Sequence, residues 1–441
     1  MSAGGLADTI AAIATATGVA GVGIVRVSGP GAIAIATRLT GRAAAALPDR
    51  TLVRAVVRDG EGRRLDDGLV VAMRAPRTFT GDDVVELQVH GGAVNLGRVL
   101  AAAVAAGARV AEPGELTRRA LVAGKVSVVE AEAMLAVIEA RTERAWALAQ
   151  AHLGGALAAS VARLRAAVTE LVAELEAHID FPEDDLPTLV RGRLRDGLAT
   201  ASASASTLAA SFGAGRVAIE GLRVAIVGAV NVGKSALLNA LVGRERALVS
   251  PEAGTTRDYV EAAVVWDGVA VTLIDTAGWR TATGELEARG IELGRARAAE
   301  ADVVVEVIAP GEDVRPLGPR SIGVASKADL GGAVPPGWLA TSVVTLAGLD
   351  QLRAQIVAFA GLADDVEAGS AVLLTARQGA AATAAANGLA AAAALLASDT
   401  QPLELAAVEA RGALEALGAL VGETVGEDVL DRLFARFCIG K

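Results

Sequence analysis

The segment that most directly suggests chemistry is Gly228-Ala-Val-Asn-Val-Gly-Lys-Ser235, which fits the pattern G-x-x-x-x-G-K-S in full. In such a loop the backbone N–H groups surround phosphates, the lysine contacts the β- and γ-phosphates, and the serine hydroxyl binds Mg²⁺. The loop follows the strand-like run 222–227 and precedes a helical pattern from Ala236 to Val242. Because this motif requires a strand before it and a helix after it, the sequence predicts a nucleoside triphosphate site here.

Two further segments predict contacts to the phosphates and to Mg²⁺. Gly254-Thr-Thr-Arg-Asp258 has the composition of a switch loop, in which Thr256 would be a second Mg²⁺ ligand. Asp275-Thr-Ala-Gly278 ends the apolar run 269–274. Its aspartate would hold Mg²⁺ through water, and the Gly278 N–H would contact the γ-phosphate.

The choice of base is predicted by Ser326-Lys-Ala-Asp329, which follows the strand-like run 322–325. Asp329 would accept hydrogen bonds from N1 and the 2-amino group of guanine, and adenine lacks both donors, so the pattern favours GTP over ATP. Ser342-Val343 is a weaker candidate for a further base-contacting loop. We expect the nucleotide to be bound by Asn231, Val232, Gly233, Lys234, Ser235, Ala236, Ser250, Glu252, Gly254, Thr255, Thr256, Asp275, Thr276, Ala277, Gly278, Ser326, Lys327, Asp329 and Ser342.

The means of hydrolysis departs from the Ras pattern. Trp279 stands where Ras-like switches carry the glutamine that orients the attacking water. Asn231, within the phosphate-binding loop, could ligate a monovalent cation that stabilises transition-state charge as an arginine finger does. Alternatively, Asn231 only ties this loop to the switch loop.

Composition restricts the classes of function. The net charge is −10, with +2 in residues 1–118 and −12 in the remainder. Because non-specific nucleic-acid binding needs clustered Lys and Arg, any RNA contact should be local or shared with a partner. The single cysteine, Cys438, excludes an intrachain disulfide and Cys-rich metal sites, which fits a reducing cytoplasm.

The hydropathy pattern predicts four consecutive parts. Residues 1–118 are a mixed α/β domain, 119–215 are helical, 216–369 are α/β, and 370–441 are helical again. The expected fold is therefore α/β plus all-α, with an N-terminal α/β domain and a Ras-like P-loop domain inserted into a discontinuous helical domain. The uncharged stretch 378–398 is mostly alanine, so we expect a buried helix and no membrane span.

The chain resembles the MnmE (TrmE) family of tRNA-modification GTPases over nearly its full length. The segments that carry this resemblance outside the nucleotide motifs are Asp8-Thr-Ile-Ala, Gly21 to Gly29, Phe79 to Glu86, His90-Gly-Gly92, Pro113-Gly-Glu115, Lys125 with Glu130-Ala-Glu132, Ile179-Asp-Phe-Pro182 and Phe437-Cys-Ile-Gly-Lys441. Other P-loop GTPases lack this first domain and this terminus.

The resemblance implies a homodimer joined through the N-terminal domains, with a tetrahydrofolate derivative, 5-formyl or methylene, bound near the junction. Arg26, Glu86 and Lys125 would line that site, with Lys441 nearby. Without the family, each would be only a surface ion-pair candidate. The resemblance also implies work with a flavin-containing partner protein, as a heterotetramer, that adds an aminomethyl-type group at C5 of the wobble uridine of tRNA.

For hydrolysis, the resemblance implies stimulation by K⁺, held by Asn231, the backbone of Ser250 and Glu252, and Thr255. Glu287 matches the acid that orients water, so Glu287 and Lys234 are the expected catalytic residues. Cys438 matches the family's terminal cysteine, and a packed thiol without chemistry is an equal alternative.

Several positions depart from the family. The P-loop has Gly-Ala-Val-Asn where relatives have Gly-Arg-Pro-Asn, and Ser326 replaces the asparagine that braces base and P-loop. Val89 replaces a glycine, and residues 309–325 are shortened. Two alternative functions share the nucleotide motifs: a ribosome-assembly GTPase of the Era or Der type, which should carry a basic RNA-binding domain, and a nucleotide-gated scaffold whose slow hydrolysis resets a partner.

Overall fold

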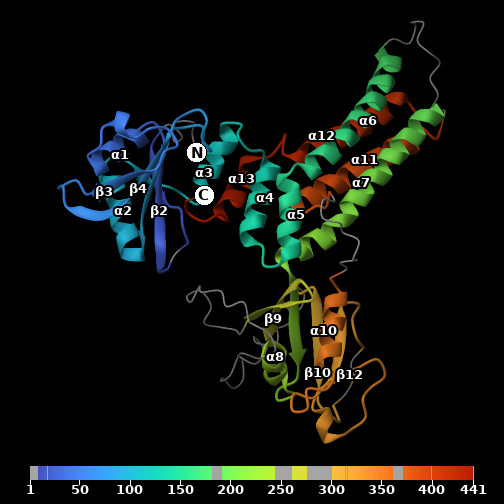
Figure 1. Ribbon diagram of the computed structural model, residues 1–441. Helices are drawn as coiled ribbons and strands as arrows, with labels where there is room; N and C mark the ends of the chain where they lie inside the picture. Colours follow the sequence, from blue (N-terminus) through green and yellow to red (C-terminus); the bar gives the residue numbers. More distant parts are fainter. Residues whose placement is uncertain are drawn as a thin grey trace, which may run out of the picture. The chain divides into compact units, whose positions relative to one another are not determined.

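The computed structural model describes residues 8–16, 18–180, 191–243, 261–275, 300–312, 314, 316–360, 371–398 and 400–440 (Figure 1). The chain forms two compact units, of which the first combines Met1–Leu135 with Val421–Lys441 and the second is Ala136–Leu420. The predicted fold class is confirmed: an α/β domain at the N-terminus, long helices, and a second α/β domain that interrupts them.

The first unit is built on a six-stranded sheet. Its strand order is β3-β4-β5-β2-β1-β6, with only β1 and β6 parallel. Alternating apolar residues turn one face of the sheet towards α1 (Ala32–Thr40) and α2 (Ala93–Ala105), where they form the core. The strands are β1 (Ile10–Ile13), β2 (Ala20–Ser28), β3 (Val53–Arg58), β4 (Arg64–Met73), β5 (Val84–Gly91) and β6 (Arg109–Val110).

The end of the chain packs into this first unit. Phe434, in α13 (Glu427–Ala435), and Phe437 are buried against Ala131 and Leu135 of α4 (Val128–Glu139). Ile439 then pairs with Pro113, just before α3 (Glu115–Val122). The C-terminal tail is therefore held beside the N-terminal sheet.

Buried charges secure the same region. Glu115 and Arg119 are almost fully buried and paired with each other at 3.0 Å, while Arg109 and Asp8 complete the network. Burial alone would raise the pKa of Glu115, but hydrogen bonds from Arg109, the Glu112 N–H and Arg119 lower it below its ordinary value. Glu115, in the segment Pro113-Gly-Glu115 that resembles the family, thus has a structural role, because its ion pairs connect α3 to Arg109 of β6.

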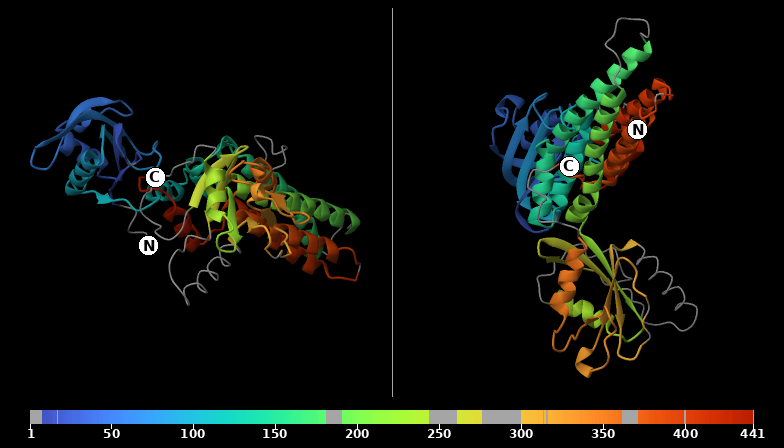
Figure 2. Two further views of the ribbon diagram at one scale, coloured as in Figure 1. Left: turned by 90° about the horizontal axis from the view of Figure 1, so that it is seen from below. Right: turned by 90° about the vertical axis from the view of Figure 1, so that its right-hand side faces the viewer.

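The helical part of the second unit packs closely because its contacts are rich in alanine. The long helices α6, α7, α11 and α12 lie beside one another (Figures 1 and 2). They are α6 (Ala156–Asp180), α7 (Arg191–Glu220), α11 (Ala376–Leu395) and α12 (Leu403–Val421), with α5 (Glu143–Leu153) before them. Within the predicted helical part 119–215, α4 and α5 are separate helices, because Thr142 is extended and its side chain caps α5 at the Ala145 N–H. Within the described residues, no helix, α11 included, has the length and apolar character needed to cross a membrane.

The second α/β domain has the strand order β12-β11-β10-β7-β9-β8, in which only β8 is antiparallel to its neighbour. Its core lies between this sheet and the helices α8 (Lys234–Val242) and α10 (Leu349–Ala358). The strands are β7 (Leu222–Gly228), β8 (Glu261–Trp266), β9 (Val269–Asp275), β10 (Val303–Ile308), β11 (Ser321–Ala325) and β12 (Leu339–Ala340).

The other face of this sheet has unusually short connections. A doubly wound sheet usually carries helices on both faces. The described residues of 309–320 form no helix, and 326–338 contain only the 3-10 turn Ala328–Leu330. Instead the Trp338 ring lies against Gly323 of β11, where even a Cβ atom would be 2.4 Å from the indole. The described residues between β10 and β11 thus carry no helix, and the Trp338 ring covers part of β11. The shortening of 309–325 relative to the family stays a prediction.

Candidate functional site

The phosphate-binding loop joins the end of β7 to the start of α8. Gly228 ends the strand with φ 151°, and a Cβ there would be 2.2 Å from the carbonyl oxygen of Val307 in β10. Only glycine fits such an approach. The loop then brings Asn231, at φ 67°, to the amino end of α8, where N–H groups and the helix dipole favour an anion.

Lys234 extends back across this loop. Its Nζ donates to the carbonyls of Gly228 (2.9 Å) and Ala229 (2.6 Å), and the residue is only 7% exposed. Burial lowers the pKa of Lys234, while the carboxylates of Asp275 and Glu312 act to raise it. The cation is thus held at the centre of the loop, where phosphates would replace solvent.

Ser235 and Asp275 come together from α8 and β9. The Ser235 hydroxyl donates to Oδ2 of Asp275 at 2.6 Å, and Asp275 is 4% exposed. The pairing of β7 with β9 places Asp275 level with Ile226, next to the loop. Two adjacent oxygen donors suit a hard cation, so these residues fit the expected Mg²⁺.

The base motif is bonded to the phosphate-binding loop. The Ser326 hydroxyl donates to the Val232 carbonyl (2.6 Å), and Lys327 Nζ donates to the Asn231 carbonyl (2.9 Å). Asp329 is exposed, and its Oδ1 accepts a hydrogen bond from the buried Ser342 hydroxyl at 2.6 Å. Ser342, expected to contact the base, is thus positioned to orient Asp329. Ser326, which stands in place of the asparagine, therefore still braces the P-loop.

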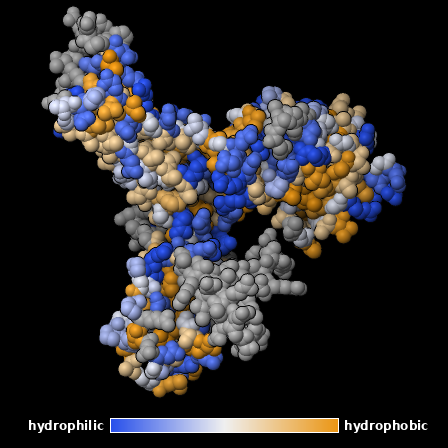
Figure 3. All heavy atoms as spheres, turned by 180° about the vertical axis from the view of Figure 1, so that it is seen from behind, coloured by the Kyte–Doolittle hydropathy of each residue, from blue (hydrophilic) through white to orange (hydrophobic). Residues whose placement is uncertain are grey.

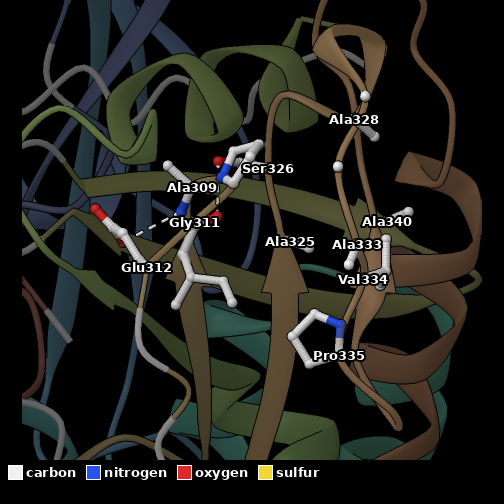
Figure 4. Close-up of a pocket in the computed structure, with 14 residues that line it drawn as sticks. Ala309, Gly311, Glu312, Ala325, Ser326, Ala328, Ala333, Val334, Pro335 and Ala340 are labelled. Atoms are coloured by element: carbon white, nitrogen blue, oxygen red, sulfur yellow. Dashed lines mark hydrogen bonds between the residues drawn. The ribbon is translucent and has the colours of Figure 1, made fainter.

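A cavity of about 200 Å³ lies beside Ser326, at the carboxyl ends of β10 and β11 (Figure 4). Glu312 is at its edge, where its carboxylate accepts a hydrogen bond from the Ala309 N–H at 3.2 Å. Sequence reasoning did not identify Glu312, because its proximity to Lys234 depends on the short connection after β10. Residues that line the cavity include Pro310, Glu312, Ser326, Val334, Pro335 and Ala340.

A second charged site lies on the N-terminal sheet. Arg26 of β2 and Glu86 of β5 are direct cross-strand partners, joined from Nε and Nη2 to Oε1 at 3.0 and 2.9 Å. Arg26 Nη1 also donates to the Gly440 carbonyl at 3.3 Å. The pair is only partly exposed, at 26% and 15% of the side chains. Gly440, in the C-terminal motif, therefore contacts Arg26, for which the resemblance implies a role in folate binding. The sequence did not indicate this contact.

Lys125 is placed near the loop that leads into β5. A Cβ on Gly81 of this loop would be 3.9 Å from Lys125 Cε. The loop is tied to β2 by a 2.8 Å hydrogen bond between the hydroxyls of Ser28 and Thr80. Lys125 thus belongs to the same end of the domain as Arg26 and Glu86.

Several predicted residues lie outside the described part of the chain. They are Ser250, Glu252, Gly254, Thr255, Thr256, Thr276, Ala277, Gly278, Glu287 and Lys441. Their roles remain predictions.

Comparison with known proteins decides the family. Residues 9–125 match the model of the GTP-binding protein TrmE N-terminus, and 128–438 match the MnmE helical domain. The tRNA modification GTPase MnmE of Symbiobacterium thermophilum is 42% identical over 98% of this chain and 99% of that protein. The MnmE of Geobacter sulfurreducens is 41% identical with the same coverage. The chain belongs to the MnmE family.

The interpretation as a tRNA-modification GTPase of the MnmE family is thereby confirmed. Among solved structures, the G domain of the T. maritima FeoB iron transporter is 26% identical and covers 32% of this chain and 98% of that chain, with a TM-score of 0.24. Lys234, Arg26 and Glu86 lie in segments that the two family models match, and Gly440 lies just beyond them.

Proposed function

We propose that this GTPase modifies the wobble uridine of tRNA at C5 with an aminomethyl-type group, together with a flavin-containing partner in a heterotetramer. A tetrahydrofolate derivative, 5-formyl or methylene, would supply the one-carbon unit. The protein would act as a cytoplasmic homodimer with an N-terminal domain (1–118), a divided helical domain (119–215 and 370–441) and a GTPase domain (216–369). The observation that carries this proposal is that one chain holds both the P-loop and the Arg26–Glu86–Gly440 site.

In the GTPase domain, Lys234 would bind the β- and γ-phosphates, and Ser235, Thr256 and water-linked Asp275 would hold Mg²⁺. The ion would neutralise charge on the phosphates. Asn231, Ser250, Glu252 and Thr255 would hold K⁺, and Glu287 would orient the attacking water. Asn231 lies within the P-loop, and this supports the cation role, since a cation held by its side chain would lie close to the transferred phosphoryl group.

In the N-terminal domain, Arg26, Lys125 and Lys441 would meet the glutamate carboxylates of the folate, and Glu86 would accept hydrogen bonds from the pterin. The half-buried Arg26–Glu86 pair supports this role. In this arrangement one Glu86 oxygen receives both Arg26 bonds, which leaves Oε2 for another donor. A fully exposed ion pair would contribute little to either binding or stability.

The sheet face that carries this pair also suits a second copy. Val22 and Leu69 are 57% and 41% exposed there, and Ile24 and Val71 are half-buried. The surface of the N-terminal lobe seen in Figure 3 carries both hydrophobic and hydrophilic residues. Apolar surface around a polar ligand site is typical of an interface that closes over it, which supports the proposed homodimer.

Calorimetry with 5-formyltetrahydrofolate on the full chain, without GTP, tests the proposal. We expect binding by the native protein and its loss in Arg26→Ala. Arg54→Ala removes an exposed Arg–Asp67 pair from the same sheet and is the matched control, with unchanged binding. The proposed site is wrong if the native protein binds no folate or if Arg26→Ala binds as well.

A further inference from the structure

The hydrogen-bond donors of residue 326 determine which edge of the base it could contact. Guanine presents N1–H and the 2-amino group as donors on its Watson–Crick edge, whereas O6, which this edge shares with the major-groove edge, and N7 on the major-groove edge are acceptors only. A residue that reads N7 must therefore donate a hydrogen bond. Serine has two donors, its backbone N–H and one hydroxyl hydrogen.

Both donors of Ser326 are already used within the protein. The backbone N–H donates to the Ile308 carbonyl at 2.9 Å. The hydroxyl lies 2.6 Å from the Val232 carbonyl and 2.9 Å from the Ile308 carbonyl, and both of these partners are acceptors. Figure 4 shows Ser326 at the edge of the cavity. A hydroxyl has a single hydrogen, so it is shared between these two carbonyls and none remains for a base nitrogen.

The environment of Ser326 keeps the hydroxyl in this bracing position. The residue is 7% exposed, between the end of β10 and the P-loop. A free hydroxyl rotating towards a base would leave the buried Val232 carbonyl without this hydrogen bond, which is unfavourable. An asparagine here differs in kind, because its amide has two N–H donors and could brace the loop while donating to a base.

The neighbouring side chains do not alter the role of Ser326. Asp329 is acceptor-only when ionised, so it suits the donor-bearing edge of guanine. Its Oδ1 is oriented by Ser342. Lys327 crosses to the Asn231 carbonyl at 2.9 Å. In this motif Asp329 is therefore the acceptor for the base, and the Ser326 hydroxyl donates to backbone carbonyls.

We propose that Ser326 braces the P-loop without contacting the base, so that this GTPase recognises guanine through its Watson–Crick edge and is indifferent to N7. The substitution of the family's asparagine thereby separates two tasks, namely loop support and base reading. The inference rests on the proposed base role of Asp329, which is tested independently by the preference for guanine over xanthine nucleotides.

The test compares GDP with 7-deaza-GDP, in which C–H replaces N7, by competition against a fluorescent GDP on the full chain with Mg²⁺. We expect native affinities that agree within about twofold. Ser326→Asn should favour GDP over 7-deaza-GDP by about three- to tenfold, the worth of one neutral hydrogen bond. Ser326→Ala should weaken both nucleotides by the same factor, because it loses only the brace.

The contrary results are distinct. If the native protein prefers GDP more than threefold and Ser326→Ala abolishes this preference, the hydroxyl contacts N7 and the proposal is wrong. A preference that survives in Ser326→Ala shows that another group reads N7, which also overturns the claimed indifference. No gain of selectivity in Ser326→Asn contradicts the explanation by donor number. Failure of Asp329 to select guanine would show as xanthine binding, whatever the response to 7-deaza-GDP.

Discussion

Ser342 and Asp329 form a short hydrogen bond in which the buried hydroxyl donates to the exposed carboxylate at 2.6 Å. The bond holds one carboxylate oxygen of Asp329 in place, although the side chain as a whole is exposed. A base-selecting carboxylate that is held in position loses less rotamer freedom when the nucleotide binds.

The first prediction concerns this pair. Asp329→Asn should weaken GTP binding strongly and allow xanthosine triphosphate to compete, because the amide can complement the altered base. Ser342→Ala should keep the preference for guanine but weaken GTP by about three- to tenfold, through loss of orientation. Competition binding of the two nucleotides measures both effects. An unchanged GTP preference in Asp329→Asn would remove this residue from base selection.

The second prediction concerns the cation. Hydrolysis should be faster in K⁺ than in Na⁺ and should rise with protein concentration, because the ordered switch loops would allow two GTPase domains to meet. Asn231→Ala should lose the K⁺ effect while it keeps much of its GTP binding. Steady-state phosphate release in matched KCl and NaCl measures this. Equal turnover in the two salts at all protein concentrations would indicate a conventional switch that needs an external activator.

Glu287→Ala separates domain pairing from the chemical step. We expect this variant to retain K⁺-dependent pairing of GTPase domains in the presence of a GTP analogue and to hydrolyse GTP very slowly. Pairing is followed by energy transfer between labelled copies, and turnover by phosphate release. Normal turnover in Glu287→Ala would assign the water-orienting role to another group.

A third prediction concerns Trp338, whose ring lies against Gly323 of β11 in the GTPase sheet. Trp338→Ala should lower the free energy of unfolding of this domain by roughly 2 kcal/mol, because a half-buried ring leaves the surface of β11. Leu330→Ala, in the same loop and 73% exposed, is the control and should change little. Denaturant unfolding of the full chain measures both. Equal stability of the two variants would show that Trp338 does not cover the sheet.

The fourth prediction concerns pH. Burial would raise the pKa of Asp66, but hydrogen bonds from His90 and from the Asn95 amide outweigh it and lower this pKa to about 2. Since the folded-state pKa lies below the ordinary value of 3.8, the stabilisation is present above about pH 4 and is lost as the pH falls towards 2. Asp66→Asn should therefore cost about 1–2 kcal/mol at pH 7 and roughly half as much at pH 3, with the remainder lost towards pH 2.

Hydrogen exchange of the β4 and β5 amides, with variant and native protein compared at each pH, measures this contribution. Asp67→Asn, which removes an exposed ion pair with Arg54, is the neighbouring control and should have little effect at any pH. A difference between Asp66→Asn and the native protein that is as large at pH 3 as at pH 7 would show that the charge of Asp66 is not its cause.

Local motifs allowed much of this architecture to be predicted. The P-loop required a strand and a helix around it, and β7 and α8 are placed accordingly. The mixed α/β domain predicted for residues 1–118 likewise contains the strands β2 and β5, with alternating buried and partly exposed residues. These inferences succeed because the periodicity of side chains follows directly from backbone geometry.

Contacts between distant segments could not be predicted in the same way. Gly440 meets Arg26 across 414 residues, and nothing in either local sequence specifies that approach. Similarly, nothing in the sequence around Ser326 specifies that its short hydroxyl comes within reach of the Val232 carbonyl, as it does at 2.6 Å. The resemblance to the family indicates that Arg26 and residue 326 are functional, whereas their partners Gly440 and Val232 follow only from the packing of distant segments.

The nucleosides of tRNA test the central claim most directly. A bacterial strain that lacks its own MnmE-family gene would express this chain or its Lys234→Ala variant, and tRNA hydrolysates would be measured by liquid chromatography and mass spectrometry. We predict that the native chain restores C5 aminomethyl-type uridines and that Lys234→Ala, produced at the same level, does not. Absence of these uridines with a folded, GTP-hydrolysing native chain, or equal restoration by Lys234→Ala, would contradict the account.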